Sequence, residues 1–167
     1  MLDYVFADLI ILHSNRSTGV DLSSLQKSLF AATGWCLAER GVLLISDRFH
    51  LSSIDRTSPI LPSLSSRFQF RQGPINFNSV VTQPYNILLP DICEFVLAIH
   101  RHLTDMGCPE LDSAINHLYG RACAEAASDR AARTRAVTGS AVQFPIPWDA
   151  VHDVFSSLPL PAYDECR

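Results

Sequence analysis

Histidines and cysteines near the middle of the chain are the first candidates for chemistry. His100, His102, Cys108 and His117 carry donor atoms that bind transition metals. On a helix, however, positions i and i+2 do not face each other, so His100 and His102 cannot share one ligand. Cys93 or Cys123 beside a histidine could form a nucleophile pair, but both cysteines lie on or beside apolar helical stripes. We therefore expect no enzymatic role, no metal and no cofactor.

Five carboxylates fall at predicted helix starts or on predicted polar faces. They are Asp91, Glu94, Asp105, Glu110 and Asp112. In those places a carboxylate complements the helix dipole and aids solubility, and this reading carries most of the weight. The functional reading is that Asp91 and Glu94 meet other carboxylates at a contact between subunits. Such carboxylates repel when ionised and share a proton at lower pH, so assembly would depend on pH.

The basic residues suggest a site for phosphates. Lys27 is the only lysine among thirteen lysines and arginines, and the net charge is −4. Nucleic acid would therefore need a local patch rather than bulk charge. Arg101 and Arg121 lie on the two helices predicted below, and phosphate contacts need only cations, hydroxyl groups and helix N-termini. The pattern fits a solvated basic face as well as an RNA groove.

A long helical hairpin over residues 83–135 is predicted to position these residues. Apolar residues recur at helical spacing in both arms, with a turn at Met106–Pro109. Pro90 and Pro109 suit the first turns of the two helices. The first stripe comprises Ile92, Phe95, Val96, Ile99 and Leu103, and the second comprises Leu111, Ile115, Leu118 and Ala122.

The remaining elements are shorter. Residues 1–13 form a helix or an edge strand, and Asp21 caps a helix that ends at Gly41. Residues 41–54 favour a second helix, with a buried strand as the alternative, and residues 66–81 alternate like two short strands. The extended segment 143–148 precedes one or two helical turns at 148–155.

The fold class predicted from these elements is mainly α. We expect an antiparallel four-helix bundle with a small two- to four-stranded β element at one end. Residues 1–147 would form the bundle domain, and residues 148–167 a short C-terminal helix and a proline-rich tail. The five cysteines are odd in number and form no CxxC pair, which favours reduced thiols in an intracellular protein. The N-terminal apolar run is too short for a membrane span.

Several short strings are similar to one known family. Leu61-Pro62-Ser63 and Ser66-Arg67-Phe68 resemble its segment after the second helix, and Pro84-Tyr85-Asn86 followed by Leu89-Pro90-Asp91 resembles the start of its third. Glu110 to Ala114 resembles the start of the fourth, and Thr138-Gly139-Ser140 with Phe144 and Trp148 resembles the segment after it. Over residues 20–150, the chain thus resembles the coat proteins of rod-shaped plant viruses of the tobamovirus type. Its connection between the third and fourth helices is shorter and poorer in arginine than theirs.

The resemblance implies a subunit that stacks in a helical rod around single-stranded genomic RNA, in the virion and the host cytoplasm. Arg101 and the positions around Asp112 and Arg121 would lie nearest the RNA. The leading hypothesis is therefore a structural coat protein with itself and RNA as partners, and no membrane. The alternative is an all-α interaction or adaptor module that binds no nucleic acid, and a small cysteine hydrolase is a weaker third.

Overall fold

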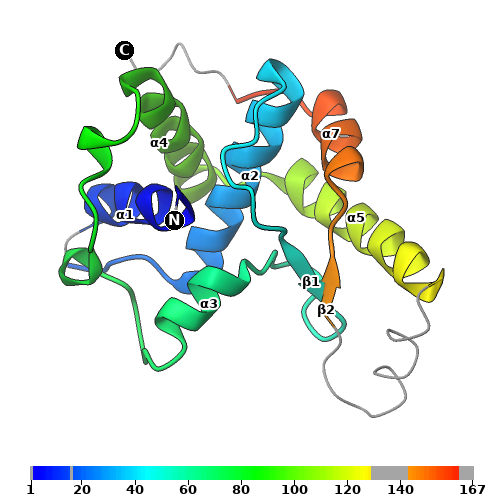
Figure 1. Cartoon of the computed structure of the whole chain (residues 1–167), viewed down its shortest axis with the longest axis horizontal. Helices are drawn as coiled ribbons and strands as arrows, with labels where there is room; N and C mark the ends of the chain where they lie inside the picture. Colours follow the sequence, from blue (N-terminus) through cyan, green and yellow to red (C-terminus); the bar gives the residue numbers. More distant parts are fainter. Residues whose placement is uncertain (1, 16, 129–142, 162–167) are drawn as a thin grey trace.

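The computed structural model describes residues 2–15, 17–128 and 143–161 of the chain. In these ranges the protein is mainly α, with six α-helices and one two-stranded antiparallel sheet (Figure 1). The elements are α1 (Leu2–His13), α2 (Leu22–Arg40), β1 (His50–Ser52), α3 (Pro62–Phe68), α4 (Pro90–Asp105), α5 (Pro109–Ser128), β2 (Gln143–Pro145) and α7 (Trp148–Ser157), with 3-10 turns η1 (Phe77–Ser79) and η2 (Pro84–Asn86).

Helix α2 lies at the centre of the core, between α4 and α7 (Figure 1). Its predicted ends are confirmed: the Asp21 carboxylate accepts from the Ser24 backbone N–H at 2.8 Å, and Gly41 at φ 65° donates to the Leu37 carbonyl at 3.0 Å. Trp35 of α2 is fully buried and packs edge-on against Phe155 of α7. Helix α7 is therefore part of the same core as the helices before it.

Helices α4 and α5 begin at Pro90 and Pro109 as predicted. The predicted hairpin is wrong, because α5 does not fold back along α4. Helix α4 packs on α1 and α2, whereas α5 packs on α7 and β2, so the two helices diverge from Gly107 (Figure 1). The stripe of α5 is buried, whereas that of α4 is buried except for the half-buried Ile92 and Leu103, and the two stripes pack against different partners. The last part of the predicted hairpin, residues 129–135, lies outside the described residues.

The sheet lies elsewhere than predicted. Segment 41–54 is not a helix: it runs as loop into β1, where Leu51 pairs with Phe144 of β2. His50 also exchanges two backbone hydrogen bonds with Ile60, at 2.8 and 2.7 Å. This pairing with distant segments outweighs the helical spacing of the local apolar residues.

Segment 66–81 does not form two strands. Its start belongs to α3, which Pro62 opens, and Phe68 is 5% exposed while Phe70 is 91% exposed. On one strand face both phenylalanines would have been buried together. Only Ile75 makes a single bridge, to Val20. The sequence alternation therefore did not reflect a sheet.

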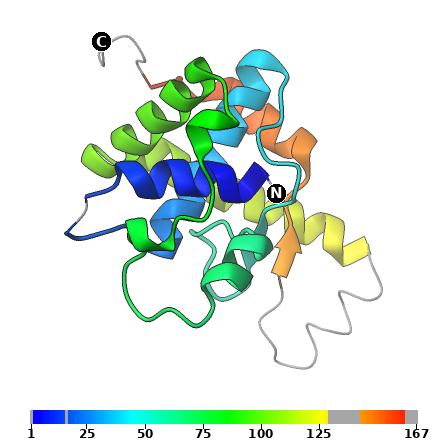
Figure 2. The same cartoon turned by 60° about the vertical axis from the view of Figure 1, so that its left-hand side comes forward.

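Residues 1–13 were predicted to form a helix or an edge strand, and the structure shows a helix, α1. Segment 77–89 crosses this helix (Figure 2). Asp8 of α1 is fully buried and holds this segment by accepting from the backbone N–H groups of Val81 and Thr82 at 3.0 and 2.8 Å. Arg67 of α3 completes the network with bonds to Asp8 and to the Ser79 carbonyl. Within the described ranges, no helix has the length and apolar character that crossing a bilayer requires.

Candidate functional site

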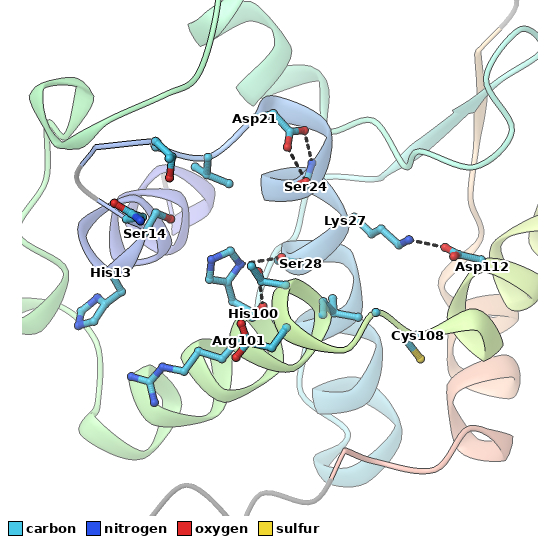
Figure 3. Close-up of a pocket in the computed structure, with 18 residues that line it drawn as sticks. His13, Ser14, Asp21, Ser24, Lys27, Ser28, His100, Arg101, Cys108 and Asp112 are labelled. Carbon is cyan, nitrogen blue, oxygen red and sulfur yellow. Dashed lines mark hydrogen bonds and ion pairs between the residues drawn. The ribbon is translucent and has the colours of Figure 1, made fainter.

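A polar cleft of about 660 Å³ opens where α1, α2, α4 and the start of α5 converge (Figure 3). Residues 14, 15 and 18–20 form one rim, and the turn between α4 and α5 forms the opposite rim. The cap that Asp21 provides fixes where α2 begins, and the two prolines fix where α4 and α5 begin. The sequence signals that define these helix ends thus also shape the cleft.

A buried histidine–serine pair lies in the cleft wall. The Nδ1 atom of His100 lies 2.9 Å from the Oγ of Ser28, and both side chains are buried. Burial, together with the nearby positive charge of Arg101, lowers the pKa of His100 to about 4. The imidazole is therefore neutral at pH 7 and shares a hydrogen bond with the Ser28 hydroxyl. This pair ties α4 to α2.

An ion pair between Lys27 and Asp112 lies at the end of the cleft where α5 begins (Figure 3). Asp21 also lines the cleft. Burial alone would raise the pKa of its carboxyl, but hydrogen bonds from Ser24 lower that pKa below its ordinary value. With Asp105, three carboxylates face two cations, Lys27 and Arg101, among the residues that line the cleft. The cleft is thus polar and close to neutral rather than strongly basic.

Arg101 differs from the other charged residues of the cleft. Its side chain is exposed and extends outwards on the side of His13 (Figure 3). Among the described residues, no carboxylate lies within ion-pair distance of its guanidinium. An unpaired guanidinium has all five N–H donors available for a phosphate or carboxylate ligand.

An aromatic pair stands beside the cleft mouth. The Tyr85 hydroxyl lies 2.7 Å from Nε2 of His13, and the rings meet edge to face at 5.8 Å between centroids. The other ring nitrogen of His13 lies 2.9 Å from the Leu9 carbonyl oxygen, so it carries the proton. Sequence reasoning missed His13 and Tyr85, because they come from segments 72 residues apart that no local pattern connects.

The predicted RNA-contact residues are brought together in part. Arg101 and Asp112 line the same cleft. Arg121 lies in a second groove of about 490 Å³ between α5 and α7, where its guanidinium is 3.1 Å from Asp153 and 3.8 Å from Asp149. The two RNA-contact arginines are therefore in different surroundings.

The predicted inter-subunit carboxylates lie at the start of α4, and both are exposed. Asp91 is 3.4 Å from Arg40 at the end of α2. Neither Asp91 nor Glu94 lines the cleft. The structure thus separates the two carboxylates from the phosphate-binding candidates.

Three of the five thiols are poor nucleophiles. Burial raises the pKa of Cys36, Cys93 and Cys108, so these side chains are protonated at neutral pH. In the part of the chain that the structure describes, no three His, Cys, Asp or Glu residues gather as a metal site would require. Neither finding gives support to the cysteine-hydrolase alternative.

Comparison with known proteins yields no relationship: no family model matches the chain, and neither does any curated protein or solved structure. A function therefore has to be argued from the cleft and the surface around it.

Proposed function

We propose that this chain is a viral coat protein that polymerises helically and packages single-stranded genomic RNA, in the virion and the host cytoplasm. The observation that carries the proposal is the guanidinium of Arg101, which stands at the mouth of a polar cleft without a carboxylate partner among the described residues. A charge left unpaired at such a place is available to a phosphate.

Other donors around the cleft suit the same ligand. Lys27 bonds to Asp112 with one of three ammonium protons, which leaves two donors. Asn15 accepts from Ser17 through its oxygen, which leaves its amide NH₂ group as a donor on the rim. None of these groups forms a base-reading pattern, so binding would be largely independent of sequence. Because Asp105 and Asp112 oppose an anion, we expect binding to be moderate for one subunit and strong only along a polymer.

The exposed apolar surface supports self-association. Large apolar side chains of segment 77–89 project to solvent, namely Phe77, Val81, Ile87 and Leu89. Such clusters mark interaction surfaces, and a heterologous contact between copies would extend into a rod. Asp91 and Glu94 follow this segment directly, which suits the proposed pH-dependent carboxylate contact. The four-helix bundle is also part of the proposal, with α2 as its central helix.

The second candidate is an all-α interaction or adaptor module. The same exposed apolar segment supports it, since that surface needs no RNA to bind another protein. The two functions differ in whether the chain binds RNA and forms long polymers.

The test is RNA binding and packaging by the purified full chain and its variants. Arg101→Gln should weaken binding of a single-stranded RNA most. Arg121→Gln should weaken it less, because Arg121 must first leave Asp149 and Asp153. Arg48→Gln, an exposed arginine away from the cleft, is the matched control. Equal binding by wild type and Arg101→Gln would remove the cleft from the proposal, and a wild-type chain that ignores RNA would favour the adaptor module.

A further inference from the structure

Tyr85 is an exposed aromatic residue that is nevertheless held in place. Tyr85 is 58% exposed, yet the Tyr85 hydroxyl donates to Nε2 of His13 at 2.7 Å. His13 is itself fixed through its other nitrogen to the Leu9 carbonyl of α1. Both ring nitrogens of His13 are therefore used within the protein, and the tyrosine ring is immobilised without being covered.

The backbone that carries Tyr85 is also fixed. Asp8 binds the backbone N–H groups of Val81 and Thr82 just before it, and the 3-10 turn η2 closes with the Ile87 N–H bonded to the Pro84 carbonyl at 3.0 Å. A ring that is ordered before binding loses little conformational entropy when a ligand stacks on it. This arrangement suits a planar ligand.

A cation lies at the same mouth as this ring. Arg101 and His13 both line the cleft, and His13 holds the Tyr85 hydroxyl. Figure 3 shows the side chains of Arg101 and His13 on the same side of the cleft. Burial raises the pKa of the Tyr85 phenol, and the positive charge of Arg101 acts against that rise. An aromatic face and a guanidinium without a carboxylate partner among the described residues therefore stand at one mouth of the cleft.

We propose that Tyr85 and Arg101 bind one nucleotide of single-stranded RNA, with the base stacked on the Tyr85 ring and the phosphate on the Arg101 guanidinium. His13 is a positioning residue that holds the ring. This inference rests on the proposed RNA-packaging function and names its nucleotide contact. Stacking on aromatic side chains accepts every base, which agrees with packaging that is independent of sequence.

A protein partner fits this mouth less well than RNA. The cleft behind the ring is lined by hydroxyls, an amide and charged groups, including Asn15, Thr18 and Lys27. A docked protein surface would have to satisfy these polar groups or leave them buried and unpaired, which is costly. The ribose and phosphate of RNA offer acceptors to them, and water can remain between.

The test compares two single-stranded oligouridylates by fluorescence anisotropy at low salt, one normal and one with abasic sites. Tyr85→Ala should weaken binding of the normal oligonucleotide by roughly 5- to 150-fold and leave the abasic one unchanged. Tyr85→Phe keeps the ring and should lose less. Phe70→Ala, which removes another highly exposed aromatic residue, is the control and should change nothing. Arg101→Gln should weaken both oligonucleotides and reduce the slope of log K against log salt by about 0.7.

The role of His13 is tested in the same assay. His13→Ala should weaken binding of the normal oligonucleotide only, and should have no further effect in the Tyr85→Ala background, because it acts through that ring. A structural role elsewhere would weaken both backgrounds equally. That result would remove His13 from the site.

Three outcomes would overturn the proposal. If wild type binds RNA and Tyr85→Ala binds both oligonucleotides as wild type does, the stacking site is refuted while the packaging function stands. If Tyr85→Ala abolishes polymerisation in the absence of RNA, Tyr85 belongs to a protein contact instead. If wild type binds no RNA under any salt condition, the packaging function fails, and the nucleotide site fails with it.

Discussion

Replacing Asp8 by alanine tests how the structure holds segment 77–89 in place. Asp8 is fully buried, and its oxygens accept from Arg67 at 2.5 Å and from the backbone N–H groups of Val81 and Thr82. The alanine variant would leave all three donors without this acceptor. Arg67, whose side chain is only 11% exposed, would then be a buried charge without its carboxylate.

The expected loss is large for one side chain. Removing one partner of a buried ion pair costs about 3–5 kcal/mol, against a total stability of roughly 5–15 kcal/mol for a domain. In the variant the guanidinium keeps its contacts with the rings of Tyr4 and Phe68, at 5.1 and 4.8 Å, and its bond to the Ser79 carbonyl, so the charge is not left without any partner and the loss should lie at the lower end of this range. We therefore expect a fall of about 3 kcal/mol in the free energy of unfolding.

Urea unfolding followed by circular dichroism and by fluorescence of the buried Trp35 measures this loss. Asp91→Asn is the matched control, because its ion pair with Arg40 is exposed and should contribute less than about 1 kcal/mol. The double variant Asp8→Ala/Arg67→Met should recover part of the stability by removing both charges. A loss below about 1 kcal/mol for Asp8→Ala, or simple additivity in the double variant, would refute the reasoning.

Three further predictions concern the central helix and its partners. Asp21→Ala removes the cap of α2 and should lower the free energy of unfolding by about 1 kcal/mol in urea titrations. Gly34→Ala should lower the melting temperature, because a Cβ atom there would meet the Phe155 ring at 2.4 Å; an unchanged temperature would contradict that packing. The unfolded chain protonates His100 near its ordinary pKa of 6.5, whereas the folded chain does so only at about 4. Stability should therefore fall by up to about 3 kcal/mol as pH drops from 6.5 to 4, and His100→Gln should abolish this part of the pH dependence in urea unfolding.

The elements predictable from the sequence are those defined by local chemistry. Asp21 and Gly41 bound α2, and Pro90 and Pro109 open α4 and α5, because caps and first-turn prolines act within a few residues. The short helix after Trp148 was found from its composition in the same way. These signals need no knowledge of the rest of the fold.

The wrong elements depend on distant partners. Residues 50–52 become a strand because they pair with β2, more than 90 residues later, and with Ile60. Residues 62–68 become a helix because Leu64 and Phe68 bury one face and Arg67 meets Asp8. The direction of α5 is likewise decided by its packing on α7 and β2 rather than by the short turn before it.

The candidate site was predictable only in part. Arg101 was singled out by its position near a helix turn and Asp112 by the family resemblance, and the two residues line the same cleft. The prediction for Arg121 did not foresee its aspartate partners on α7. His13 and Tyr85 meet only because segment 77–89 crosses α1, and no spacing in the sequence indicates that crossing.

The measurement that tests the central claim most directly is negative-stain electron microscopy of the purified chain. The samples are prepared with and without single-stranded RNA, at about pH 5.5 and about pH 8. Each sample is then treated with nuclease, and the protected RNA is recovered. Clustered carboxylates with raised pKa would lose their shared protons between these two values. The account predicts rods that contain nuclease-resistant RNA, and shorter or fewer rods at the higher pH if Asp91 and Glu94 control assembly. Small single particles under all four conditions, with every added RNA degraded, would contradict the coat function and favour the adaptor module.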